Sequence, residues 1–89
     1  MSQASTRGAE MNDLIRPLRS LCGLTQEQFA ARLGVTVVTV NRWENKRTQP
    51  MPLASRQLKA LLLEISQSAL AVDQAAAHGF LEQYFPQTY

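Results

Sequence analysis

The sequence contains few of the residues that metal sites, disulfides and membrane spans require. Its 89 residues include one cysteine, Cys22, and one histidine, His78. A lone cysteine excludes an intramolecular disulfide, and these two residues alone cannot supply the ligands of a zinc site. No run approaches the roughly 18 apolar residues that a membrane span needs. We therefore expect no metal, no cofactor and no membrane contact, and we expect Cys22 to be a small apolar residue near a helix end.

Groups that could carry out catalysis are also missing. The sequence shows no paired acids, no nucleophile beside a base and no phosphate-binding loop. We therefore do not expect this protein to be an enzyme. A chain of 89 residues forms one small domain with a modest core, to which oligomerisation would add stability. The polar start MSQASTRGAE has no apolar segment. We expect residues 1–11 to form a disordered tail and the protein to be cytoplasmic.

Basic residues are concentrated in the middle of the chain. The net charge is +2, but the segment from Arg16 to Lys59 carries eight basic residues against two acidic ones, which is +6. The remaining residues together carry −4. Such a distribution indicates a polyanionic partner for residues 16–59, although solvated basic faces are common in proteins of many functions.

The first helix is indicated in the stretch DLIRPLRSLCG. Apolar residues recur there at the spacing of one helical face, and Gly23 follows as a stop signal. We expect Asp13 to cap this helix, which places Pro17 at the end of the first turn. A kink, or a later start near Arg16, is also compatible with the proline.

The second helix has clearer signals at both ends. Thr25 and Gln28 have the spacing of a capping box, in which each side chain binds the backbone N–H of the other residue. Gly34 supplies the positive φ that ends a helix abruptly. Between them, the residues expected on the buried face are Phe29, Ala30 and Leu33.

The stretch TVVTVNRWE, residues 36–44, starts with five β-branched residues, which is typical of a strand. As a strand it would place Arg42 on one face and Asn41 on the other, and no other segment of the sequence is recognisable as a partner strand for it. As a helix capped by Thr36, it turns Val40 and Trp43 inward with Val35. The poor helix propensity of the β-branched residues costs about 2 kcal/mol of stability in total. Burial of Val40 and Trp43 contributes about 1.5 to 3 kcal/mol for each side chain, which outweighs that cost. We therefore predict a helix whose outward face carries Val37, Val38, Asn41, Arg42 and Asn45.

Taken together, GLTQEQFAARLGVTVVTVNRWENKRTQP resembles the helix-turn-helix of the Cro and phage-repressor family, also called XRE. Ala30 is small where the two helices cross, and Gly34 forms the turn. The apolar places of the seam are filled by Phe29, Leu33, Val35, Val40 and Trp43. The resemblance runs from about Leu14 to about Leu62. It implies an all-α, lambda-repressor-like domain of four to five helices over residues 12–65, with a helical C-terminal extension over residues 66–89.

The resemblance also implies an interface with double-stranded DNA. Gln26 and the amides that follow it would contact a phosphate. The helix from Val37 would lie in the major groove, where Val37 and Val38 suit thymine methyl groups and Arg42 suits guanine. The remaining candidates are short polar residues for phosphate or adenine, and basic residues for phosphates: Thr36, Thr39, Asn41, Asn45, Lys46 and Arg47. The alternatives are that the two valines are buried against a neighbouring helix and that Arg42 is merely solvated.

Glu44 and Lys46, near the end of this helix, differ from the DNA-contacting residues in charge and in family pattern, respectively. An acid facing DNA would be repelled, and the resemblance implies that Glu44 instead pairs with Arg19 of the first helix. Lys46 stands where the family usually has glycine. Because lysine is strained in the left-handed conformation, Asn45 is an alternative residue for the positive φ.

The C-terminal third allows two architectures. Pro52 suits the first position of a helix. A seam of heptad spacing follows at Leu58, Leu62, Ile65, Ala69, Val72 and Ala76 and allows one long coiled-coil helix. Two helices that close the domain's own core, with a break at residues 66–68, fit equally well. The aromatic residues after Gly79 suggest a contact with another subunit or a partner: Phe80, Tyr84, Phe85 and Tyr89.

Two functions agree with these features. The first is a sequence-specific, DNA-binding transcriptional regulator that acts as a homodimer on two half-sites. The second is an antitoxin or adaptor whose C-terminal region binds a protein partner and whose DNA binding serves autoregulation, since many small proteins that resemble this family are antitoxins.

Overall fold

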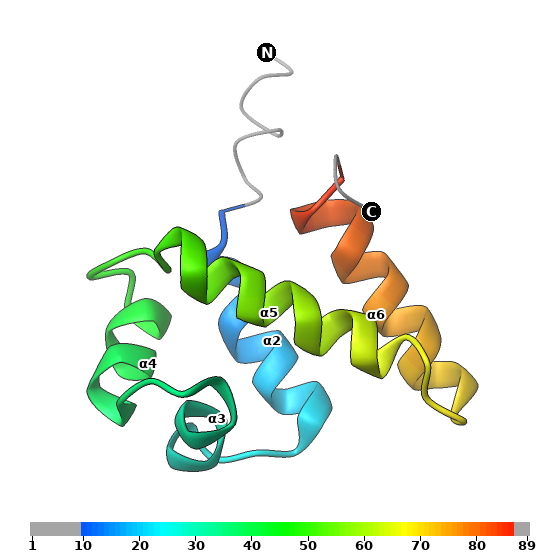
Figure 1. Ribbon diagram of the computed structural model, residues 1–89, viewed down its shortest axis with the longest axis horizontal. Coiled ribbons are helices and arrows are strands. Elements are labelled where there is room, and N and C mark those ends of the chain that lie inside the picture. The colour runs from blue at the N-terminus through cyan, green and yellow to red at the C-terminus, as the bar shows by residue number, and fades with distance from the viewer. Residues whose placement is uncertain (1–9, 87–89) are drawn as a thin grey trace.

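Five α-helices make up the part of the chain that the computed structural model describes, residues 10–86 (Figure 1). They are α2 (Asn12–Cys22), α3 (Gln26–Leu33), α4 (Val37–Glu44), α5 (Pro52–Ile65) and α6 (Ala71–Tyr84). Residues 10–86 contain no strand, and the predicted all-α fold is confirmed. The tail expected at residues 1–11 lies outside the described residues except for Glu10 and Met11, and Met11 packs against the core.

The start of α2 differs from the prediction. Met11 is the N-cap residue and makes no side-chain capping hydrogen bond, whereas Asp13 lies inside the first turn. The expected Asp13 cap is therefore wrong, and the Asp13 carboxylate instead lies 3.1 Å from the Lys46 ammonium. Pro17 lies within the helix, which continues to its predicted end at Gly23, where φ is 69°. The first turn of α2 therefore contacts the distant loop after α4 and has no side-chain cap of its own.

The two helices of the helix-turn-helix begin as predicted. The Gln28 N–H donates to Thr25 Oγ1 at 3.1 Å, and the Thr25 N–H donates to Gln28 Oε1 at 3.0 Å, so the capping box is complete. Gly34 ends α3 with a φ of 76°. Thr36 Oγ1 accepts the Thr39 N–H at 3.1 Å and caps α4. The helical interpretation of the β-branched stretch is confirmed.

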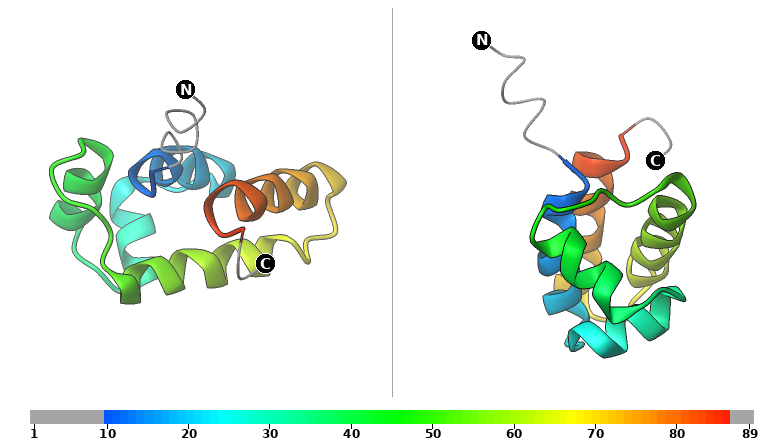
Figure 2. Two further views of the ribbon diagram at one scale, coloured as in Figure 1. Left: turned by 90° about the horizontal axis from the view of Figure 1, so that it is seen from above. Right: turned by 90° about the vertical axis from the view of Figure 1, so that its left-hand side faces the viewer.

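A single apolar cluster joins all five helices. Val40 and Trp43 are the buried residues of α4, and their burial outweighs the poor helix propensity of their neighbours. Figure 2 shows α3 and α4 at one end of the molecule, with α5 and α6 extending away from them. The members of the cluster are Leu14, Ile15, Leu18, Phe29, Ala30, Leu33, Val40, Trp43, Leu58, Leu61, Leu62, Ala77 and Leu81.

The C-terminal third folds back as two separate helices. α5 starts with Pro52 and ends at Ile65, and α6 begins at Ala71, so the break includes the predicted residues 66–68. α6 then packs against α5 and α2. The alternative of one long coiled-coil helix is wrong, and Val72 of its proposed seam is exposed. A return helix buries apolar surface within the same chain, which a solitary long helix would leave in water.

The C-terminal aromatic residues contribute to the fold itself. Phe80, Tyr84 and Phe85 are partly buried against the core, and the ring centroids of Phe80 and Tyr84 are 6.4 Å apart. Tyr89 lies outside the described residues. Less aromatic surface is thus open to another chain than the sequence suggested. The exposed large apolar residues of this region are Leu63, Leu70 and Val72.

Candidate DNA interface

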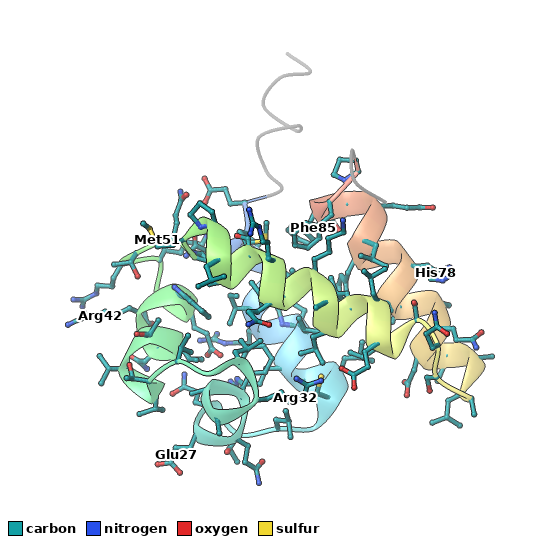
Figure 3. The ribbon with its side chains drawn as sticks, in the orientation of Figure 1. Glu27, Arg32, Arg42, Met51, His78 and Phe85 are labelled. Atoms are coloured by element: carbon teal, nitrogen blue, oxygen red, sulfur yellow. The ribbon has the colours of Figure 1, made fainter. Side chains whose placement is uncertain are left out.

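The outward face of α4 presents the side chains that we expected to read bases. Val37 is 37% exposed and Val38 is 53% exposed, so the alternative that they are buried against a neighbouring helix is wrong. Arg42 is exposed, and Figure 3 shows it projecting from α4 away from the other helices. A helix that carries both apolar groups and a guanidinium on one free face has the chemistry needed to distinguish bases in a major groove.

The short polar residues of α4 make local hydrogen bonds on the same helix. Thr36 Oγ1 lies 2.9 Å from Thr39 Oγ1, in addition to accepting the Thr39 N–H. Asn45 Nδ2 donates to the Asn41 carbonyl at 2.9 Å and to Asn41 Oδ1 at 3.2 Å. These contacts restrict the side chains to defined positions on the surface, which reduces the conformational freedom that binding would remove.

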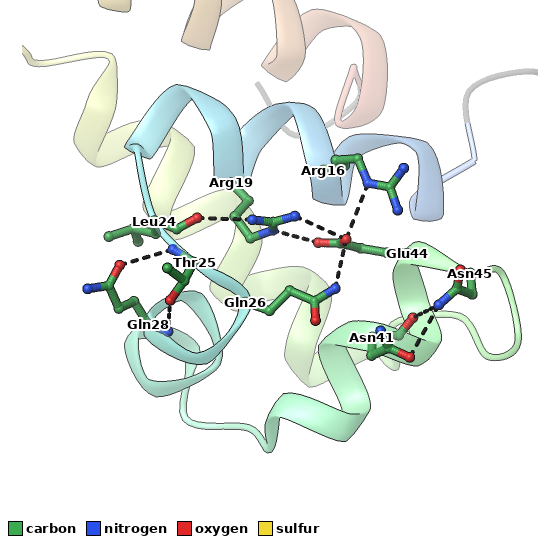
Figure 4. Close-up of polar contacts among 9 residues, drawn as sticks. All are labelled: Arg16, Arg19, Leu24, Thr25, Gln26, Gln28, Asn41, Glu44 and Asn45. Carbon is green, nitrogen blue, oxygen red and sulfur yellow. Dashed lines mark hydrogen bonds and ion pairs between the residues drawn. The ribbon is translucent and has the colours of Figure 1, made fainter.

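A buried carboxylate connects α4 to α2 and α3. The Glu44 side chain is 1% exposed, and Arg19 donates to it twice, from Nε at 2.7 Å and from Nη2 at 3.2 Å. Gln26 Nε2 donates to Glu44 Oε1 at 2.9 Å, and Arg16 Nε donates to the same oxygen at 3.3 Å (Figure 4). The predicted ion pair between Arg19 and Glu44 is confirmed. The structure adds Gln26 and Arg16, which the sequence did not associate with Glu44.

Two opposing effects act on the pKa of Glu44. Burial raises the pKa of this carboxyl, but the hydrogen bonds from Arg19, Gln26 and Arg16 together lower it below its ordinary value. The hydrogen bond to Glu44 in turn raises the pKa of Arg19. The carboxylate therefore stays ionised at neutral pH, and it holds α4 in a fixed position relative to α2 and α3.

Gln26 occupies the first position of α3, but its carboxamide is turned toward Glu44. The Gln26 side chain was expected to contact a DNA phosphate, and here its nitrogen donates to the Glu44 carboxylate. The first backbone N–H groups of a helix have no partner within that helix. A phosphate at the start of α3 would thus be bound chiefly by backbone N–H groups, with Gln26 held beside them.

The loop after α4 differs from the prediction. Lys46 has a φ of 58°, whereas Asn45 has a φ of −96°, so the suggestion that Asn45 takes the positive φ is wrong. The Lys46 N–H donates to the Trp43 carbonyl at 3.1 Å, and the Lys46 ammonium lies 3.1 Å from Asp13 Oδ1. These contacts hold lysine in a conformation that costs about 1–2 kcal/mol. The hydrogen bond with Asp13 also raises the pKa of Lys46.

Asn12 is an important residue that sequence reasoning missed. It is 6% exposed, and its Nδ2 donates to the Trp43 carbonyl at 2.9 Å and to the Thr48 carbonyl at 2.8 Å. Asn12 thereby ties the end of α4 and the following loop to the first turn of α2. Its partners are backbone carbonyls 31 and 36 residues away, so no sequence signal could have identified them.

The fold and the free face of α4 define a DNA-binding protein of the helix-turn-helix class. A helix-turn-helix family model matches residues 15–62, slightly more than half of the chain. The chain belongs to this family, of the Cro and phage-repressor (XRE) type, and it is a DNA-binding regulator. Searches of curated proteins and of solved structures found no significant match. No helix within residues 10–86 is long and apolar enough to cross a membrane.

Proposed function

We propose that this protein is a sequence-specific transcriptional regulator that inserts α4 into the major groove of double-stranded DNA as a homodimer. The observation that carries the proposal is the exposed face of α4, which the buried Glu44 carboxylate holds rigidly against α2 and α3. A recognition helix that is already fixed loses little conformational freedom when it enters the groove.

The side chains of this face divide by chemistry into two groups. Val37 and Val38 offer apolar surface that suits thymine methyl groups, and Arg42 can donate two parallel hydrogen bonds to guanine. The second group is suited to phosphate or adenine and consists of Gln26, Thr36, Thr39, Asn41, Asn45, Lys46 and Arg47. Contacts of the second group with the backbone set position and salt dependence, whereas contacts of the first group set sequence preference.

Apolar surface near α4 supports the homodimer. Met51 and Leu53, at the start of α5, are 71% and 68% exposed. They line an apolar hollow of about 590 Å³ to which Thr39 and Trp43 of α4 also contribute. Exposed apolar surface of this kind is typical of a protein contact. Two copies would read two half-sites about one helical turn apart, which adds affinity and specificity to a single short helix.

Selection of bound sites from random DNA tests this proposal most directly. We expect two half-sites related by two-fold symmetry, with A·T pairs opposite Val37 and Val38. Replacing both valines with serine should relax the preference at those positions by roughly 1 kcal/mol and leave non-specific binding nearly unchanged. Unaltered selected sequences would contradict the assigned role of the valines. Affinity that does not fall steeply with salt would contradict DNA binding itself.

A second candidate function is supported by a different surface. Leu63, Leu70 and Val72 are exposed around the connection between α5 and α6, and no lysine or arginine follows Lys59 in the sequence. This apolar, non-basic end is compatible with an antitoxin or adaptor that grips a protein partner and uses its DNA binding for autoregulation.

Paired surface variants separate the two candidates. Leu70→Ser with Val72→Ser changes the far end of the molecule, and Met51→Ser with Leu53→Ser changes the end near α4. Loss of a co-purifying protein in the first variant alone supports the partner function. Dissociation of a dimer in the second variant alone, measured by sedimentation, supports the homodimer. Surface variants are preferable to truncation, because Ala77 and Leu81 of α6 are fully buried in the core.

A further inference from the structure

Arg16 lies beside the candidate DNA interface and contacts the buried carboxylate of Glu44. Its side chain is 64% exposed, and its Nε donates to Glu44 Oε1 at 3.3 Å. Gln26 Nε2 donates to that same oxygen at 2.9 Å. One carboxylate oxygen of Glu44 therefore brings the Arg16 guanidinium next to the first residue of α3, where the helix offers backbone N–H groups to an anion.

The charges around Glu44 do not balance. Glu44 carries one negative charge, and Arg19 already contacts both of its oxygens through two hydrogen bonds. Arg16 adds a second guanidinium, which donates to Glu44 through its Nε. In Figure 4 the contact drawn between Arg16 and Glu44 starts from Nε, and none is drawn from the two terminal nitrogens of Arg16. The surplus positive charge of the cluster is thus presented on an exposed group.

We propose that Arg16 binds a phosphate of the DNA backbone through its terminal nitrogens, beside the start of α3. This inference rests on the proposed function, and it adds a residue that was not among the DNA-contacting candidates expected from the sequence. Glu44 acts as the positioning residue, because it holds Nε and leaves the outer edge of the guanidinium free to meet a phosphate in its planar fork geometry. Asn45 follows Glu44 directly as the exposed C-cap of α4, so it is a neighbouring polar group for the same DNA strand.

A phosphate contact and a base contact have different signatures. A guanidinium that binds phosphate changes affinity and salt dependence equally for all DNA sequences, because the backbone carries no sequence information. Each phosphate neutralised contributes about 0.9 to the slope of log affinity against log salt concentration. Arg16 should therefore affect the slope and leave the preferred sequence unchanged.

The test compares Arg16→Gln with Arg56→Gln in the full chain, using one selected duplex and one unrelated duplex. Both variants remove one positive charge, but Arg56 lies on α5 and lines a surface with Lys59 and Phe85. We expect Arg16→Gln to reduce the slope by about 0.9 on both duplexes and to weaken binding about three- to tenfold at low salt. Arg56→Gln should leave the slope unchanged. Arg16→Lys should restore the slope, because it restores the charge.

Thermal melting controls for folding. Arg16→Gln should melt close to wild type, because Glu44 keeps its hydrogen bonds from Arg19 and Gln26. If Arg16→Gln melts well below wild type, the salt-dependence slope of Arg16→Lys is the test instead. A slope of Arg16→Lys well below that of wild type would then overturn the inference. An unchanged slope in folded Arg16→Gln, with steep salt dependence in wild type, also overturns it. A wild-type protein without steep salt dependence would overturn the proposed function itself, which is a separate result.

Discussion

α3 and α4 have the same length and the same kind of start, but they end by different means. Each helix has eight residues and a threonine N-cap that accepts the N–H three residues further on. α3 ends at Gly34, where φ is 76°. α4 is followed by no glycine, and Lys46 adopts a φ of 58°. The end of α3 is thus determined by one local residue, whereas the end of α4 depends on contacts with α2.

This difference matters because α4 is the helix that we propose to enter the major groove. α2 reaches the end of α4 and the residues after it through polar contacts: Arg19 and Arg16 bind Glu44, Asn12 binds the Trp43 carbonyl, and Asp13 binds Lys46. Polar contacts have defined directions, so they fix the orientation of α4 more narrowly than apolar packing alone. Removing these contacts one at a time tests whether α4 depends on α2 in this way.

The largest effect should come from Arg19→Ala. This change leaves the Glu44 carboxylate, which is 1% exposed, without its bidentate partner. Loss of one member of a buried pair costs about 3–5 kcal/mol, here reduced to the extent that Arg16 and Gln26 still donate. Arg32→Ala is the matched control, because it removes an arginine from an exposed pair with Glu64, for which we expect less than about 1 kcal/mol. Equal melting temperatures for the two variants would contradict the structural role of Arg19.

Low pH should weaken the ion pair between Arg19 and Glu44. The pKa of Glu44 is lower in the folded protein than the ordinary value of a glutamate side chain. Its contribution to stability is therefore complete above that value and is lost as the pH falls through the lower pKa of the folded state. Denaturant unfolding at a series of pH values should show this loss in wild type and a smaller acid dependence in Arg19→Ala. A mutant with the full wild-type acid dependence would assign the effect to other carboxyl groups.

Asn12→Ala should have the next largest effect. It removes a buried donor from the Trp43 and Thr48 carbonyls and should cost about 1–3 kcal/mol. Asn45→Ala is the matched control, because its amide donates to the Asn41 carbonyl on the exposed surface. The free energy of unfolding should fall clearly more for Asn12→Ala than for the control. Similar losses would mean that the tether between α2 and the loop adds no stability.

Gly34→Ala should destabilise the protein by about 1 kcal/mol. A Cβ at Gly34 meets no neighbouring atom, so the cost arises from the positive φ alone. Gly79→Ala provides a control of opposite sign, because Gly79 lies within α6 and has no positive φ. Alanine is favoured there by roughly 0.5–1 kcal/mol. Thermal or denaturant unfolding of both variants should therefore show shifts in opposite directions.

Lys46→Gly should have the smallest effect, a gain of roughly 0.5 kcal/mol. Glycine removes the strain of the left-handed conformation but loses the exposed ion pair with Asp13, which contributes little. Lys46→Ala keeps the strain and loses the ion pair, so its stability should fall slightly. A glycine variant no more stable than the alanine variant would show that the loop has relaxed around Lys46.

Features that depend on neighbours in the sequence could be predicted. Thr25, Gln28 and Gly34 act within one turn of a helix, so their chemistry can be recognised without knowledge of the fold. The inward Val40 and Trp43 follow from helical periodicity in the same way. The Arg19–Glu44 pair was predicted through a family resemblance, which carries information about tertiary contacts that the residues themselves do not state.

The sequence by itself determined the starts of α3 and α4, the turn between these two helices, and the face of α4 that meets solvent. It determined them because hydrogen bonds and apolar spacing within a helix involve residues three or four positions apart. Only the tertiary structure decided the contacts of Asn12 and Arg16 with the end of α4, the positive φ of Lys46, and the return of α6 onto the core. Each of these depends on groups that lie far apart in the sequence and meet only when the helices pack.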